Sequence, residues 1–360
     1  MNIKEDFYLG ANTSDGFISL YSQLTEDEKQ NKILVIKGGP GTGKSTIIRK
    51  VGTWFSERGS VEYGHCSSDP DSLDAVILKE IGVSVIDGTP PHALEPALPG
   101  AFESIIDLYP LWDEDGLEKV RKNIEEIAQK CTKCHKKAIK YMSIATILSQ
   151  CNATLVESAL DKEKIKMFCN KIIKNVVGKK NGSGKDEKIR FLSAITPKGV
   201  YTYKSTINSN YEEIYLIEDE FGVVSSIILE QIREKLINLN YSIITCYCVL
   251  SPNKKIEHIL VPEIKVAFVT SNSFHEFQKS DKKHTIRARR FLYKNIILDN
   301  KQKLKFNNEV KKLVIEQSIK SMNEAKKYHD ELEKLYTGNV DFKKMEDLTL
   351  NIIKKIGQRV

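Results

Sequence analysis

The chain of 360 residues repeats itself, and this internal repeat restricts its fold more than any other feature of the sequence. Tyr8–Gly16 aligns with Phe191–Gly199, and the apolar run Ile33–Ile36 aligns with Ile214–Ile217. The offset between aligned residues stays close to 181 along the whole chain. A single continuous domain does not produce such a register, so we predict two tandem copies of one domain.

The predicted domains are residues 1–186 and residues 187–360. The segment Gly178–Lys188, rich in glycine, lysine and serine, is typical of a flexible, solvated linker between them. With 41% apolar and 29% charged residues, each copy can form an apolar core, which excludes a globally disordered chain.

Short apolar runs alternate with helical stretches in each copy, and this alternation is typical of α/β proteins with a parallel sheet. In the first copy, the strand Ile33–Ile36 precedes a helix predicted over Lys44–Ser56. A second helix, started by a proline, is predicted near Asp71–Glu80, before the strand Val83–Ile86. Apolar residues three and four positions apart over Leu117–Leu148 then predict a helical arm, and the second copy carries a similar pattern.

One motif in the first copy indicates chemistry. The segment Gly38–Ser45 reads Gly-Gly-Pro-Gly-Thr-Gly-Lys-Ser, which fits G-x-x-x-x-G-K-[ST] and lies between a predicted strand and a predicted helix. Glycines at such positions let backbone N–H groups converge on one point at a helix N-terminus, where a triphosphate binds. The expected nucleotide-binding residues are Gly38, Gly39, Pro40, Gly41, Thr42, Gly43, Lys44, Ser45 and Thr46.

Within this motif, Lys44 is expected to contact the β and γ phosphates as a positive charge, and the Ser45 hydroxyl to ligate Mg²⁺. Thr46 is expected to contact the α phosphate or simply to continue the helix. The fold class predicted is therefore α/β, with two tandem copies of a P-loop NTPase-like parallel-sheet domain, each followed by a helical arm. The cofactors expected are ATP and Mg²⁺.

A magnesium site needs a carboxylate, and the strand Val83–Ile86 ends in Asp87. We predict that Asp87 is the second Mg²⁺ ligand and a catalytic residue together with Lys44. The residue after Asp87 is Gly88, where many motor ATPases have a glutamate that polarises water. This departure weakens a motor interpretation.

Two further acids, Asp69 and Asp71, follow a predicted strand that ends at Cys66, at the edge of the sheet where α/β proteins bind ligands. They are candidates to orient a water molecule or an acceptor hydroxyl. The alternative is that they cap the predicted helix near Pro70, a common function of aspartate. Both interpretations remain open at this point.

The second copy lacks these chemical groups. Ser225 occupies the position of Lys44, and the loop begins with Asp219 and Glu220. Asp69, Asp71 and Asp87 are replaced as well, by Ser251, Asn253 and Thr270. Joint loss of these residues supports a joint function in the first copy, and the second copy is predicted to be a degenerate pseudo-domain.

The second copy is also the basic one, with 30 basic and 22 acidic residues in residues 187–360 against 25 and 26 in residues 1–186. Arg287, Arg289 and Arg290 are candidates to supply a cation in trans to the ATP site, between the two copies or between two chains of a homo-oligomer. The same basic half is a candidate surface for nucleic acid or a protein partner. The alternative is a solvated lysine-rich surface. The basic residues that form this cluster are Lys282, Lys283, Arg287, Arg289, Arg290 and Lys294.

Composition gives the expected compartment. Seven cysteines is an odd number spread over a long chain, as in reduced intracellular proteins. The N-terminus lacks the apolar run of a signal peptide, and the longest charge-free stretch, Leu236–Asn253, contains several polar residues. We therefore expect a cytoplasmic protein with no membrane partner.

The sequence resembles an uncharacterised bacterial family of tandem P-loop ATP-binding proteins, described as ATPase-like or nucleotide-kinase-like. The resemblance covers nearly the whole chain. It depends on the tandem repeat, on Ile36–Thr46, on the His-Cys-Ser-Ser-Asp-Pro-Asp segment at His65–Asp71, and on Ile86–His92. It implies ATP binding but names no substrate. Members of this family can carry two intact loops, and Asp219–Ser226 departs from that pattern.

The sequence supports three functional hypotheses. The first is an ATPase whose single site in the first copy is coupled to movement of the helical arms or to a partner. The second is a phosphotransferase that acts on a nucleotide or another small acceptor. The third is an ATP-gated protein that binds nucleic acid through its basic half. Fold alone does not choose among them.

Overall fold

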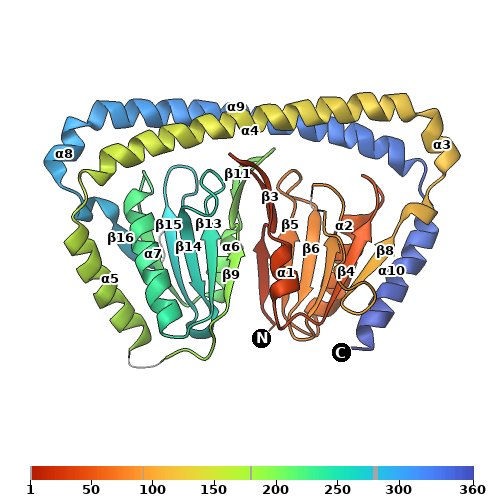
Figure 1. Cartoon of the computed structure of the whole chain (residues 1–360), viewed down its shortest axis with the longest axis horizontal. Coiled ribbons are helices and arrows are strands. Elements are labelled where there is room, and N and C mark those ends of the chain that lie inside the picture. Colours follow the sequence, from red (N-terminus) through yellow and green to blue (C-terminus); the bar gives the residue numbers. More distant parts are fainter. Residues whose placement is uncertain (1, 92, 179–180, 279–282) are drawn as a thin grey trace.

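A computed structural model describes residues 2–91, 93–178, 181–278 and 283–360. It is an α/β structure with two six-stranded sheets placed side by side and two long helices across the top of both (Figure 1). Elements of the first half are β1 (Lys4–Phe7), β2 (Gly10–Thr13), β3 (Gly16–Ser19), α1 (Ser22–Glu26), β4 (Lys32–Lys37), α2 (Lys44–Ser56), β5 (Val61–His65), β6 (Leu73–Leu78), β7 (Val83–Asp87), β8 (Glu103–Asp107), the 3-10 turn η1 (Tyr109–Leu111), α3 (Glu114–Lys119), α4 (Arg121–Glu157) and α5 (Lys162–Val177).

The second half carries equivalent elements. These are β9 (Glu187–Arg190), β10 (Ser193–Thr196), β11 (Gly199–Thr202), α6 (Lys204–Asn210), β12 (Glu213–Glu218), α7 (Val223–Asn238), β13 (Ile243–Tyr247), β14 (Ile256–Val261), η2 (Pro262–Ile264), β15 (Val266–Ser271), β16 (Lys283–Arg287), η3 (Ala288–Phe291), α8 (Lys294–Asp299), α9 (Lys301–Thr337) and α10 (Phe342–Gly357). The paired helices α4 and α9 have equal lengths, as do α5 and α10.

The two sheets have the same topology. Their strand orders are β1-β5-β6-β7-β4-β8 and β9-β13-β14-β15-β12-β16. Five strands of each sheet run parallel to one another, and β6 or β14 runs antiparallel between its neighbours. The internal repeat in the sequence therefore corresponds to a repeat of strand order, and each sheet is mixed rather than purely parallel.

The predicted helix at Asp71–Glu80 is wrong, because this segment forms strand β6. All six residues of β6 are buried, between β5 on one side and β7 on the other. A short run of six mostly apolar residues is consistent with either a buried strand or a buried helix, and here burial on both faces of the sheet favours the strand. Consequently, Asp69 and Asp71 do not cap a helix.

Alternation of side chains along β4 explains how the first sheet is covered. Ile33 and Val35 are fully buried with Tyr21 and Leu24 of the α1 region. Ile36 faces the opposite side, where it packs with Ile47 and other residues of α2. Successive side chains of a strand point to opposite faces, so an apolar run such as this one requires cover on both sides.

The helical arms are exchanged between the halves. Helix α4 leaves the first half and lies along α9, and α5 then packs on α7 of the second half (Figure 1). In return, α9 leaves the second half and α10 packs on α2 of the first. Met345, Ile352 and Ile356 of α10 belong to the same buried cluster as the apolar side chains of α2. Each half thus completes the core of the other.

The halves also meet directly at the edges of their sheets. Tyr8 and Phe191 form a two-way backbone bridge, with N–O distances of 2.8 and 3.2 Å. Beside it, Arg190 donates to Glu62 at 2.5 Å, and both side chains are almost fully buried. The described part of the predicted linker is also anchored, because Gly182 and Gly184 donate to the carbonyls of Leu239 and Asn240. Lys179 and Lys180 lie outside the described residues.

All seven cysteines have free thiols. Among the described residues, each helix is too short or too polar to cross a lipid bilayer.

Candidate functional site

The glycine-rich loop (Gly38–Gly43) joins the end of β4 to the start of α2. Gly41 and Gly43 adopt left-handed backbone conformations, with φ values of 66° and 83°. Only glycine adopts such angles without strain, and Gly43 is the N-terminal cap of α2. The six residues of the loop therefore wrap around the N-terminus of a 13-residue helix, as the sequence motif requires.

Lys44, the first residue of α2, folds back over this loop. Its Nζ donates to the carbonyl oxygens of Gly38 and Gly39 at 2.9 and 2.7 Å. The same Nζ lies 3.6 Å from Oδ2 of Asp87, the last residue of the neighbouring strand β7. Both side chains are largely buried, at 11% and 13% exposure. The two predicted catalytic groups are therefore brought together.

Asp87 is held in an environment that disfavours its charge. Burial raises the pKa of its carboxyl group, and the nearby charge of Asp74 adds to this effect. The charge of Lys44 and hydrogen bonds from Thr89 oppose the shift but do not cancel it. A carboxylate in this position gains from a cation bound beside it.

Ser45 and Thr46 differ in their surroundings. Ser45 Oγ accepts a hydrogen bond from the backbone N–H of Leu73 at 2.9 Å, which places it between α2 and the start of β6. A hydroxyl oxygen that accepts one bond retains a second lone pair, so it remains able to ligate a cation. Thr46 is exposed on α2, and its predicted contact with an α phosphate stays a prediction.

Sequence reasoning missed Asp74, which is 7% exposed in strand β6. The pairing of β5 with β6 shifts register between Gly64 and His65, and Asp74 is the extra residue at this β-bulge. Its charge acts on Asp87 and on the thiol of Cys66, whose pKa is raised mainly by burial and further by Asp74. The sequence signal that could have identified Asp74 is its position as the single acid in the otherwise apolar run Leu73–Leu78.

The predicted acids Asp69 and Asp71 are both tied to the second half. Asp69 accepts from the Ser72 hydroxyl at 3.0 Å and lies 3.3 Å from Nζ of Lys326, on helix α9. Asp71 is exposed and pairs with Lys198 at 2.5 Å, which lowers its pKa. These acids therefore connect the rim of the site to the exchanged arm and to the β10–β11 hairpin.

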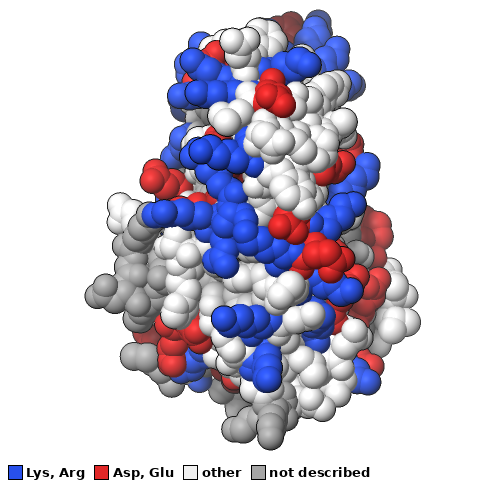
Figure 2. All heavy atoms as spheres, turned by 90° about the vertical axis from the view of Figure 1, so that its left-hand side faces the viewer, with Lys and Arg blue, Asp and Glu red and all other residues white. Residues whose placement is uncertain are grey.

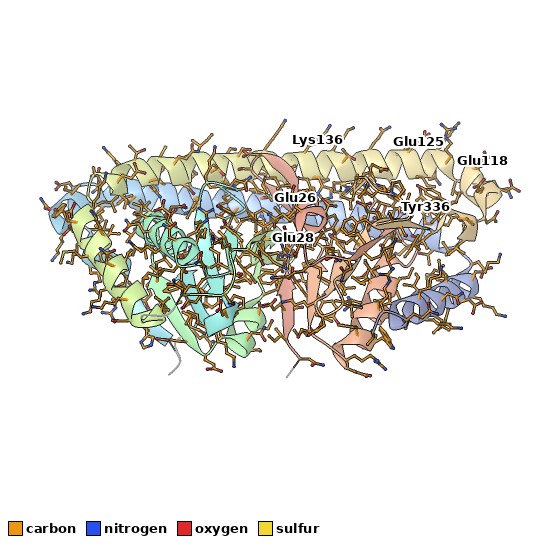
Figure 3. All side chains as sticks on the ribbon, turned by 60° about the horizontal axis from the view of Figure 1, so that its bottom comes forward. Glu26, Glu28, Glu118, Glu125, Lys136 and Tyr336 are labelled. Carbon is orange, nitrogen blue, oxygen red and sulfur yellow. The ribbon has the colours of Figure 1, made fainter. Side chains whose placement is uncertain are left out.

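The end of α9 and the start of α10 cover the glycine-rich loop. A Cβ atom at Gly41 would lie 2.7 Å from the carbonyl oxygen of Glu333, and one at Gly43 would collide with the sulfur of Met345. Figure 3 shows Tyr336 at the first-half end of the arm, whereas Glu125 and Lys136 lie along α4. The glycines at these positions thus also permit close approach of the arm.

The arginines predicted to act in trans do not reach this loop within one chain. Arg287 lies at the end of β16, 3.7 Å from Glu218, and the guanidinium of Arg290 lies over the ring of Phe168. Strand β16 is at the opposite end of the molecule from α2 and β8 (Figure 1). The second half instead brings Lys326 to the first site. Lys282 and the side chain of Lys283 lie outside the described residues.

The equivalent loop of the second half is shorter. It has four residues, 219–222, because α7 begins at Val223 directly after Gly222. Asp219 is 4% exposed and accepts from the backbone N–H groups of Ser225 and Phe221, at 2.8 and 3.3 Å. A carboxylate of the protein itself therefore occupies the N-terminus of α7, where an anion would otherwise bind.

The bulge is repeated in the second half, where it places Glu257 and His258 in the core near His275. Burial lowers the pKa of His258 to about 3, and its Nδ1 accepts from the backbone of Thr270 at 3.3 Å. These three side chains, and separately His329, Asp330 and Glu333 on α9, are close enough together to share a metal ion. Burial lowers the pKa of both His258 and His275, which favours their neutral forms. Neutral histidines can pack in a protein core without a metal ion.

No protein-family model, curated protein sequence or solved structure matches this chain. The resemblance to tandem P-loop proteins therefore remains a sequence-based expectation. The geometry of the first-half site and its contrast with the second half are the basis on which a function can be assigned.

Proposed function

We propose that the protein is a P-loop NTPase that binds Mg-ATP at one site, in the glycine-rich loop of its first half, and hydrolyses it. One observation carries this proposal. Lys44 lies across a six-residue glycine-rich loop at a helix N-terminus, within 3.6 Å of a largely buried aspartate on the adjacent strand. This set of groups can bind a triphosphate and the cation that accompanies it.

The residues present fit a magnesium ion. Ser45 retains a lone pair, and Asp87 is a largely buried carboxylate whose ionised form needs a neighbouring positive charge. Both would hold the ion. The charge of Asp74, which already acts on Asp87, would favour a cation there as well. When bound, Mg²⁺ neutralises charge on the phosphoryl oxygens. In this proposal Lys44 leaves the carbonyls of Gly38 and Gly39 and binds the phosphate oxygens instead.

Coupling to the helical arms is suggested by the segments that cover the loop. Because Glu333 and Met345 lie against Gly41 and Gly43, occupation of the loop alters the contacts of α9 and α10. Asp69 and Lys326 form a second connection between the site and the same arm. We therefore propose that hydrolysis changes the position or mobility of the exchanged arms.

The test uses γ-labelled ATP with wild-type protein and the Lys44→Ala variant, followed by separation of free phosphate from other labelled products. Free phosphate produced by the wild type alone supports the ATPase. Limited proteolysis with ADP and with a non-hydrolysable ATP analogue then tests coupling. Cleavage of α4 or α9 should differ between the two nucleotides, and identical digests would contradict it.

A phosphotransferase is the second candidate for the same site. The observation that favours it is the residue after Asp87, which is Gly88 and so provides no carboxylate to polarise a water molecule. The labelling experiment distinguishes the two. With a pool of nucleosides, nucleotides and metabolites present, label on a pool component rather than in free phosphate would identify a kinase.

Nucleic-acid binding by the second half is a third candidate. Lys and Arg side chains gather at the end of the molecule formed by α5, α8 and the start of α9 (Figure 2). Exposed basic residues of these helices and of η3 include Lys162, Lys164, Lys166, Arg289, Arg290, Lys294, Lys301 and Lys303. The test is retention of DNA or RNA over a salt series, because phosphate contacts give a steep loss of affinity with salt. Retention that is absent at low salt would exclude this candidate.

A further inference from the structure

Two aromatic side chains, Trp112 and Tyr336, lie against the glycine-rich loop, and Tyr109 packs on Trp112. We call these three residues the aromatic cluster. The ring of Trp112 lies edge-on to Tyr109 and Tyr336, with centroids 4.4 and 5.8 Å away. A Cβ atom at Gly39 would lie 3.0 Å from Tyr336 and 3.3 Å from Trp112. The cluster therefore forms one wall of the loop.

Both halves of the protein fix this cluster in place. Tyr109 and Trp112 follow strand β8 of the first half, whereas Tyr336 comes from α9 of the second. Asp113 donates to Asn339 and Asp341 donates to Leu111, both through backbone atoms at 2.9 Å. These bonds flank the Trp112–Val340 bridge and hold the segment after β8 against the turn between α9 and α10.

The second half has the same bridge without the aromatic rings. There Leu292 pairs with Leu160, the positions equivalent to Trp112 and Val340 at an offset of 180. The equivalents of Tyr109, Trp112 and Tyr336 are Arg289, Leu292 and Val156. Attachment of an exchanged arm therefore does not require aromatic residues at these three positions, although Phe291 packs there on Phe168 of α5, with ring centroids 5.1 Å apart. The cluster of three rings occurs in the half that has the glycine-rich loop and Lys44.

The location of the cluster fits one part of a nucleotide. Strand β4 lies between β7, which ends in Asp87, and β8, which leads into Tyr109. If the metal and terminal phosphate are on the Asp87 side of the loop, the rest of the nucleotide extends towards β8. Tyr109 is 48% exposed and presents a ring there. Trp112 Nε1 is shielded from solvent and finds no acceptor among the described residues.

We propose that the aromatic cluster is the binding site for the base of the nucleoside triphosphate whose phosphates the glycine-rich loop binds. This inference rests on the proposed function. Every nucleobase has a flat π face, so a stacking site binds nucleotides without strong selection of one base. Because Tyr336 belongs to the exchanged arm, binding of the base also involves the second half directly.

The experiment measures binding of two ligands to the full-length protein by calorimetry: Mg-tripolyphosphate, which has no base, and a non-hydrolysable Mg-ATP analogue. The variants Trp112→Leu and Tyr336→Val introduce the residues found at the equivalent positions of the second half. Each should weaken binding of the ATP analogue about 5- to 150-fold, the usual effect of losing a stacked aromatic ring. Binding of tripolyphosphate should not change. Tyr293→Leu, an exposed aromatic residue of the second half, is the control.

A second readout uses fluorescence. The chain has two tryptophans, so Trp54→Phe leaves Trp112 as the only indole emitter. Its emission should change on addition of the ATP analogue and much less on addition of tripolyphosphate.

The outcomes separate the two proposals. Equal weakening of both ligands by Trp112→Leu, or no weakening of either, would overturn the base-binding site. Neither result would contradict the proposal that the loop of the wild-type protein binds phosphate. If tripolyphosphate does not bind wild-type protein, or binds equally well to Lys44→Ala, the proposed function fails as well.

Discussion

The two halves of this protein have the same strand order and the same exchanged arms, but their loops after the central strand differ. In the first half, six residues with two left-handed glycines precede Lys44. In the second, four residues precede a helix whose N-terminus is already occupied by Asp219. The second half forms the same strand order without a glycine-rich loop, so folding alone does not explain that loop in the first half.

Several differences between the halves lie around this loop. Lys44, Asp69 and Asp87 have no counterpart of their type in the second half, and neither does Trp112. The bulge in the antiparallel strand and the bridge to the exchanged arm are present in both. Features shared by both halves are structural, and features found only in the first define the candidate site.

The largest expected effect comes from Lys44→Ala. Loss of a positive charge that contacts the phosphates should lower ATP affinity or turnover about 100- to 1,000-fold. The equivalent change in the second half, Ser225→Ala, should leave both unchanged. Binding and phosphate release measured for the two variants test this contrast, and similar losses in both would break it.

Replacement of the buried Lys311 should stabilise the protein. Burial lowers the pKa of this lysine to about 8, and the nearby charge of Lys255 contributes. Keeping it protonated at neutral pH therefore destabilises the folded state, and Lys311→Met should raise the free energy of unfolding by up to about 3 kcal/mol at pH 7. Chemical denaturation measures this, with the exposed Lys312→Met as the control.

The stabilisation by Lys311→Met should depend on pH. Between pH 8 and the ordinary lysine pKa of 10.5, the unfolded chain binds more protons at Lys311 than the folded protein does. The contribution of Lys311 to wild-type stability therefore rises with pH over this range, and the advantage of Lys311→Met shrinks. An advantage that stays constant to pH 10.5 would show that the lysine is not buried as a cation.

A smaller effect is expected from Asp219→Ala. This change removes the acceptor of two backbone N–H groups at the N-terminus of α7, and should cost about 1–2 kcal/mol of stability. Millimolar sulfate should restore part of the loss by binding at the vacated helix terminus. Thermal unfolding with and without sulfate measures both. Equal sulfate stabilisation of the wild type would contradict the view that Asp219 occupies an anion site.

The smallest effect, defined by its direction, is expected from Asp87→Asn. Since burial raises the pKa of Asp87, its ionised form destabilises the folded state at neutral pH. The stability of the wild type falls as pH rises through the raised pKa, because the carboxyl group then ionises inside the folded protein. Asp87→Asn should therefore be more stable than the wild type at pH 7 but not at pH 3. Mg²⁺ should stabilise the wild type and not the variant. Lower stability of Asp87→Asn at pH 7 would contradict this interpretation.

The motif of the first half and the bounds of α2 could be predicted from the sequence because both depend on local patterns. The glycine spacing and the apolar periodicity of residues 44–56 lie within one continuous segment. Asp87 could be predicted as well, since it ends an apolar strand next in space to the loop. The internal repeat made the loss of Lys44 in the second copy visible without any structure.

Other features could not be predicted, because they depend on contacts between distant segments. Periodicity shows which face of α4 or α9 is apolar, but not which half that face covers. Lys326 and Tyr336 therefore contact residues of the first half that are more than 200 positions away in the sequence. No local sequence pattern predicts these contacts. The segment Leu73–Leu78 fits a helix as well as a strand because it is a short apolar run, and the position of Asp74 depends on that choice.

The central claim is that one half of a duplicated chain binds nucleotide and the other does not. The most direct test is the stoichiometry of a non-hydrolysable Mg-ATP analogue, measured by calorimetry on wild type, Lys44→Ala and Ser225→Ala. The account predicts one nucleotide per chain for wild type and Ser225→Ala, and none for Lys44→Ala. Two nucleotides per wild-type chain, or one that persists in Lys44→Ala, would contradict it.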